Sequence, residues 1–128
     1  MAYEDDSTEK PAVTKDMIRF NGVGDDGHET FLLNREDKPA EWSSDQENVF
    51  NFCKTACKPY DIYVTATLIL ARFHLGEKNI KISSDGIITD WEAGLSLLNT
   101  TLGKNLEIVS NNSKEIGDAT IHTLNACV

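Results

Sequence analysis

Residues 60–75 are apolar on nearly every side, and they constrain the fold more than any other part of the chain. Their acidic and basic residues are Asp61, Arg72 and His74. A helix that is apolar around its circumference is normally buried on most faces, and the glycine at position 76 is a typical helix end. We therefore predict a central helix over this run. Its many β-branched residues leave a buried strand as the alternative.

The N-terminal third predicts a β-hairpin with a long loop. Two short apolar runs, residues 17–20 and 29–33, flank residues 21–27, which hold three glycines in seven. Such runs on either side of a Gly, Asp and Asn cluster are typical of paired strands. Residues 1–15 show no apolar periodicity and are expected to form a flexible acidic tail. Residues 16–128 are then expected to form one domain.

Two Ser/Thr-x-x-Glu patterns, at residues 44–47 and 89–92, match the capping box that begins many helices. The first precedes apolar residues at helical spacing, which predict an amphipathic helix ending before Pro59: Val49, Phe50, Phe52, Cys53 and Ala56. The second precedes a similar stripe, which predicts a helix ending at Gly103: Trp91, Leu95, Leu98 and Leu102. Trp42 and Trp91 stand beside these helix starts and are expected to pack against the core.

Further strands are expected over four short segments: residues 79–83, 87–88, 106–109 and 119–124. The first two flank Asp85-Gly86, a strong tight-turn signal. The resulting order is β-β-α-α-β-α-β, with or without the last strand. It predicts a single compact α+β domain, in which a small antiparallel or mixed sheet packs on two to three helices.

The acidic charge of the chain is concentrated near its N-terminus. The formal net charge is −9 at pH 7. Residues 1–50 hold 13 acidic and 5 basic residues, a balance of −8, whereas residues 51–128 hold 8 and 7, a balance of −1. A surface of this sign repels nucleic-acid phosphates, so we expect no direct binding to DNA or RNA. An acidic surface is complementary to a basic protein partner, or it only keeps the protein soluble.

The sequence favours a cytoplasmic protein with unpaired thiols. Polar and acidic residues follow Met1, in place of the apolar stretch of a secretory signal. Residues 60–75 are too short to span a bilayer, so no membrane association is expected. The three cysteines are an odd number without dense spacing, and thiols are the default state in the cytoplasm.

The loop after the first strand holds the most suggestive chemical groups, Asp25, Asp26 and His28. Carboxylates beside a histidine suit general acid–base chemistry or metal-assisted hydrolysis. Gly and Asp are also the residues that any hairpin loop prefers, and the zinc-protease signature H-E-x-x-H is absent. The sequence therefore allows two interpretations, a plain loop and a catalytic loop. Catalysis would require that Asp25, Asp26 and His28 converge with Arg72 or His122.

Cys53 and Cys57 lie four residues apart and would share one face of the predicted helix. Their thiols could form half of a zinc site. Cysteine on an apolar stripe is more often a small buried hydrophobe. We expect no metal and no cofactor.

The acidic N-terminal third and the lack of a catalytic motif favour a non-enzymatic protein-interaction module. It would be a small acidic accessory protein of the viral or mobile-element type. Its acidic side chains would face a basic protein partner: Asp25, Asp26, Glu29, Glu36, Asp37 and Glu41. The alternative is a small metal-dependent hydrolase that uses Asp25, Asp26 and His28.

Overall fold

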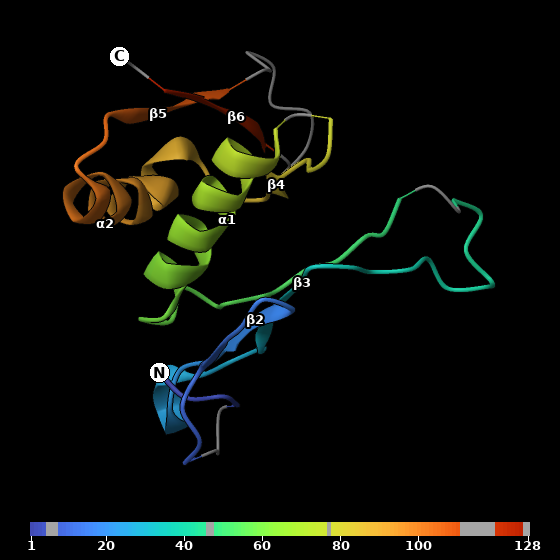
Figure 1. The fold of residues 1–128 in the computed structure, drawn as a ribbon. Helices are drawn as coiled ribbons and strands as arrows, with labels where there is room; N and C mark the ends of the chain where they lie inside the picture. The colour runs from blue at the N-terminus through green and yellow to red at the C-terminus, as the bar shows by residue number, and fades with distance from the viewer. Residues whose placement is uncertain (5–7, 46–47, 77, 111–119, 127–128) are drawn as a thin grey trace. The chain divides into compact units, whose positions relative to one another are not determined.

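The chain runs through short strands first and through helices and strands later, as the computed structural model shows (Figure 1). Side chains are described up to Ile108, and the backbone is described over residues 1–4, 8–45, 48–76, 78–110 and 120–126. The residues group into two units, 1–60 and 61–128. Antiparallel sheets and helices occupy separate segments, which confirms the α+β class. The proposed boundary between a tail and one domain stays a prediction.

The first unit contains a three-stranded antiparallel sheet in the order β1-β2-β3. These strands are Ala12–Val13, Met17–Phe20 and Phe31–Asn34. Phe20 on β2 pairs with Phe31 on β3, and both side chains are buried with ring centroids 5.0 Å apart. The predicted hairpin with a long loop is therefore confirmed.

Part of the expected tail is ordered against β2. Ala2 is buried, and its N–H and carbonyl groups bond to the backbone of Asn21. The Arg19 guanidinium on β2 forms an ion pair with Glu4 and lies 4.3 Å from the ring centroid of Tyr3. These contacts join residues far apart in sequence, so apolar periodicity along the tail gives no sign of them.

The amphipathic helix predicted over residues 49–56 is absent, and this prediction is wrong. Ala56 and Cys57 have φ angles of 50° and 54°, which are left-handed values that an α-helix does not contain. Phe50 and Phe52 are exposed, so the apolar stripe buries too little surface to stabilise a helix.

The second unit contains two packed helices, α1 (Asp61–Leu75) and α2 (Glu92–Leu102), as predicted. α1 is followed by Gly76 at a φ of 78°, and α2 by Gly103 at a φ of 61°. Both values lie in the left-handed region that favours glycine, so both predicted helix ends are confirmed.

The connection between the helices differs from the sequence expectation. β4 comprises Ser83–Ser84 alone, and a 3-10 turn over Ile88–Trp91 replaces the expected return strand. The Asp90 carboxylate accepts a hydrogen bond from the N–H of Ile87 at 2.9 Å, which caps this turn at the start of α2. Ile82 is buried, so its alternation with polar neighbours reflects contact with the core and not strand pairing.

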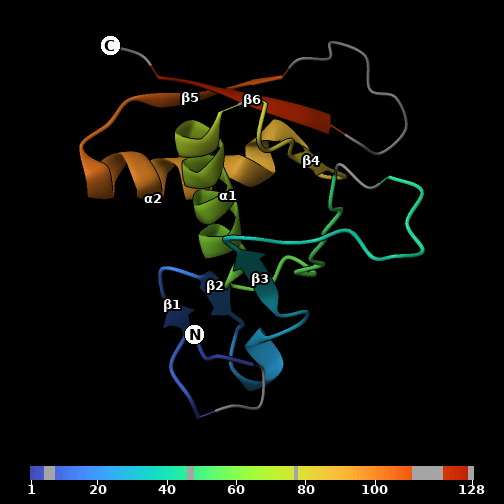
Figure 2. The ribbon, with the colours of Figure 1, turned by 45° about the vertical axis from the view of Figure 1, so that its right-hand side comes forward.

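Two late strands complete the second unit, β5 (Leu106–Ser110) and β6 (Thr120–Ala126). They pair antiparallel, and β4 pairs with the other edge of β6. β6 contacts α1 while β5 contacts α2, so the strands lie against the helix pair (Figure 2). Both predicted late strands are confirmed.

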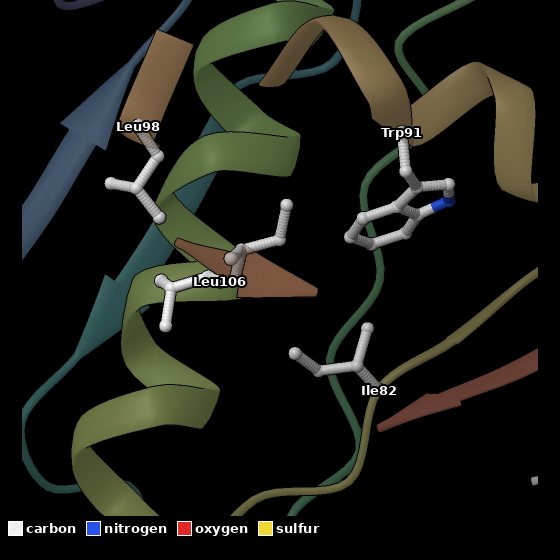
Figure 3. Packing of buried hydrophobic residues seen from close by; sticks show 5 residues of the cluster. Ile82, Trp91, Leu98 and Leu106 are labelled. Carbon is white, nitrogen blue, oxygen red and sulfur yellow. The ribbon is translucent and has the colours of Figure 1, made fainter. Parts of the chain in front are cut away.

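The core of the second unit joins side chains from both helices, from the segment between them and from β5 (Figure 3). Five buried residues form it: Ile69, Ile82, Trp91, Leu98 and Leu106. The expected packing of Trp91 against the core is confirmed. Burial of side chains of this size contributes roughly 1.5–3 kcal/mol each.

Candidate functional site

A buried amide shapes the loop that carries the candidate acidic residues. The Asn21 side chain is 1% exposed, and its Oδ1 accepts hydrogen bonds from the N–H groups of Gly22 (2.8 Å) and His28 (3.1 Å). Its Nδ2 donates to the His28 carbonyl (2.9 Å) and to Oγ1 of Thr30 (3.1 Å). A β carbon at Gly22 would lie 1.9 Å from the carbonyl oxygen of Asp26, so glycine is required there. The loop backbone is thus fixed from within.

Asp25 and Asp26 lie in a 3-10 turn, η1 (Gly24–Asp26), and both are exposed. The ammonium group of Lys58 donates a hydrogen bond to the backbone carbonyl of Asp25 at 2.6 Å. This positive charge partly offsets the negative potential beside Asp25.

His28 and Glu29 hold the loop against the backbone of Lys54. Nδ1 of His28 lies 2.8 Å from the Lys54 carbonyl oxygen, so a neutral ring carries its proton on Nδ1. The Glu29 carboxylate accepts a hydrogen bond from the Lys54 N–H at 2.7 Å. The carbonyl oxygen of Glu29 accepts another from the buried Tyr60 hydroxyl at 2.6 Å. Both candidate residues therefore have structural roles in the first unit.

The hydrolase alternative gains no support from these contacts. Nδ1 of His28 is engaged by a backbone carbonyl, which leaves Nε2 as the ring atom for other chemistry. Within the described residues, no three His, Cys, Asp or Glu side chains gather closely enough to hold a metal ion. The required convergence with Arg72 or His122 is untested, since Arg72 belongs to the second unit and the His122 side chain lies outside the described residues. The alternative stays a prediction.

The other acidic candidates follow β3. The Asp37 carboxylate accepts hydrogen bonds from Nδ2 of Asn34 at 2.8 Å and from Nδ2 of Asn51 at 3.2 Å. Asp37 therefore links the start of the long connection between β3 and α1 to Asn51 further along it. Glu36 and Glu41 are exposed on the same connection.

Three aromatic side chains on this connection are exposed, which the sequence analysis missed. Trp42 is 90% exposed, Phe50 is 82% exposed and Phe52 is 70% exposed. The expected packing of Trp42 against the core is therefore wrong. The rings of Phe50 and Phe52 lie near each other, with centroids 6.0 Å apart. Their acidic neighbours in the sequence were a usable signal, because apolar residues inside a strongly charged segment have few buried positions available.

Cys53 and Cys57 share no helix face, because no helix forms around them. Cys53 is half-buried with its Sγ 3.5 Å from the Glu29 carbonyl oxygen, whereas Cys57 is exposed. Neither forms a disulfide within the described residues, and Cys127 lies outside them.

Comparison with protein-family models, curated proteins and solved structures finds no significant match. Neither helix in the described residues is long and apolar enough to cross a membrane.

Proposed function

We propose that the chain is a non-enzymatic protein-interaction module whose first unit presents acidic side chains to a basic protein partner. The observation that carries the proposal is the exposure of Asp26, Glu36 and Glu41. Among the described residues, no hydrogen bond or ion pair engages these three carboxylates.

The charge of the two units supports this assignment. Residues 1–60 hold 13 acidic and 7 basic residues, a balance of −6, whereas residues 61–128 hold 8 and 5, a balance of −3; together these give the total of −9. The first unit is therefore the more acidic one, although the difference is smaller than the halves of the sequence indicate.

Three of the six acidic candidates are less available to a partner. Glu29 and Asp37 are engaged by hydrogen bonds inside the unit, and Asp25 lies beside the Lys58 ammonium group. Asp26 and the two exposed glutamates remain as the side chains best placed to meet a partner. Charges at the rim of an interface chiefly raise the association rate and make binding depend on salt.

The test is affinity capture from a lysate of the organism that makes the protein, with the captured protein identified by mass spectrometry. Wild type is compared with a triple variant, Asp26→Asn, Glu36→Gln and Glu41→Gln. A matched control removes three exposed charges from the second unit: Asp85→Asn, Glu92→Gln and Glu107→Gln.

The proposal predicts a basic protein that wild type and the control capture equally. The first triple variant should retain much less of it. Capture should fall on the order of tenfold as salt rises from 0.1 M to 1 M, which shortens the Debye length from about 10 Å to about 3 Å. Capture that is indifferent to salt and equal for both triple variants would contradict the proposal.

A further inference from the structure

The most unusual surface of the first unit is a loop that combines exposed aromatic rings with acidic side chains. We define the aromatic loop as residues 36–45 and 48–53. Trp42 and Phe50 on it are almost fully exposed. Tryptophan and phenylalanine are among the residues that folding normally buries most. The exposed rings of Phe50 and Phe52 lie near each other, and exposed apolar groups of this size are typical of an interaction site.

The two ends of the aromatic loop are tied together. Asp37 bonds through its carboxylate to Asn51, and Lys54, directly after the loop, is held by His28 and Glu29. Hydrogen bonds between residues close in sequence shape the interior of the loop. There the Asp45 carboxylate accepts hydrogen bonds from the N–H and the side-chain amide of Asn48. A loop whose ends are already fixed loses less conformational entropy on binding than an open chain.

The charge of the aromatic loop indicates what covers it. Its residues include four acidic side chains, Glu36, Asp37, Glu41 and Asp45, and one basic side chain, Lys38. This balance of −3 disfavours nucleic acid and anionic membranes, and it disfavours a second copy of a chain with a net charge of −9. A positively charged surface with apolar side chains is complementary to both features.

We infer that the aromatic loop binds a basic amphipathic segment of a partner protein, with Trp42, Phe50 and Phe52 as its apolar anchors. The inference rests on the proposed function and adds the residues that supply most of the affinity. Aromatic anchors, above all tryptophan, are enriched among residues that dominate binding. The surrounding carboxylates would orient the partner and exclude competitors of negative charge.

The test titrates the full chain with two labelled synthetic peptides, measured by fluorescence anisotropy. The first carries Leu and Lys at helical spacing, so that one helix face is apolar. In the second, each Leu is replaced by Ser and the charge is unchanged. Wild type should bind the Leu-Lys peptide about tenfold more tightly than the Ser-Lys peptide, because the Leu-Lys peptide alone engages the rings.

The decisive variant combines Trp42→Ala, Phe50→Ala and Phe52→Ala. It should bind both peptides equally and with the affinity that wild type shows for the Ser-Lys peptide. The matched control, Val13→Ala with Ile87→Ala, removes apolar groups that are 74% and 56% exposed elsewhere, and should bind as wild type does. Because all five side chains are exposed, folding should persist, and thermal melting checks it; Trp42→Ala alone provides a milder second variant.

The outcomes separate the inference from the proposed function. Suppose that the aromatic variant still prefers the Leu-Lys peptide, whereas neutralising Asp26, Glu36 and Glu41 lowers the affinity for both peptides. The inference is then wrong and the proposed function stands. If charge neutralisation leaves both affinities unchanged, the proposed function fails as well. Concentration-dependent dimerisation in sedimentation, abolished by the aromatic variant, would make a second copy the occupant and would overturn the inference.

Discussion

The side-chain amide of Asn21 bonds to both backbone groups of His28, accepting from its N–H at 3.1 Å and donating to its carbonyl at 2.9 Å. One buried side chain thereby takes the place of a strand partner across the loop between β2 and β3. His28 is fixed in turn against Lys54, at the end of the aromatic loop. The position of the aromatic loop in the first unit therefore depends on an amide far from it in the sequence.

Replacing Asn21 should destabilise the protein markedly. Asn21→Ala leaves the N–H and carbonyl of His28 without their partner in a partly buried site, which should cost about 2 kcal/mol of unfolding free energy. Asn21→Asp should cost more, because it removes the donor and introduces a buried charge. Urea denaturation measures both effects. Asn105→Ala, at an exposed position of the second unit, serves as control and should change stability by less than about 0.5 kcal/mol. An equally small effect at Asn21 would refute this account of the loop.

Gly94 on α2 should not tolerate alanine. A β carbon there would lie 2.2 Å from Oγ1 of Thr65 and 2.9 Å from the backbone nitrogen of Ala66, so α1 and α2 would have to separate. We expect a loss of about 1–3 kcal/mol from overpacking, which outweighs the gain of up to about 1 kcal/mol in helix propensity. Ser96→Ala on an exposed position of α2 should be neutral or slightly stabilising. Thermal unfolding distinguishes the two, and a more stable Gly94→Ala protein would show that the helices are not in close contact.

The two tryptophans should differ in their access to solvent. Trp42 is 90% exposed and Trp91 is 5% exposed. Acrylamide, a neutral quencher, should therefore quench Trp42 severalfold more efficiently than Trp91. Fluorescence of the Trp42→Phe and Trp91→Phe variants isolates each signal. Equal quenching of the two variants would mean that the aromatic loop buries Trp42.

Divalent metals separate the proposed function from the hydrolase alternative. A metal bound by Asp25, Asp26 and His28 at a concentration of 100 times its dissociation constant would stabilise the fold by about 2.7 kcal/mol. For a chain of this size, that corresponds to a rise in melting temperature on the order of 10 °C. We expect no such rise with Mg²⁺, Mn²⁺ or Zn²⁺. A rise that Asp25→Asn and Asp26→Asn together abolish would favour the hydrolase.

Local patterns predicted the elements whose stabilising contacts lie close in sequence. The apolar run from Asp61 to Leu75 forms a helix because its own residues supply the buried surface, and Gly103 ends α2 through its own backbone conformation. Residues 49–56 show where local sequence patterns fail. Their apolar spacing matches a helix, but nothing in a local pattern reveals whether a surface is present to cover Phe50.

Charge alone singles out Asp26, Glu36 and Glu41, and their side chains are exposed. Their role as a binding site stays a prediction. The structural roles of Glu29 and His28 could not be predicted from the sequence, because their hydrogen bonds reach Lys54, about 25 residues away. The exposure of Trp42 escaped prediction for the opposite reason, since an aromatic residue beside a predicted helix normally packs inward.

The association rate constant of the captured partner tests the central claim most directly. Stopped-flow measurements compare wild type with the variant Asp26→Asn, Glu36→Gln and Glu41→Gln at low and high salt. If the acidic surface attracts a basic partner, the variant should associate several times more slowly at low salt, and the difference should vanish near 1 M salt. Equal association rates for the two proteins at low salt would contradict the claim.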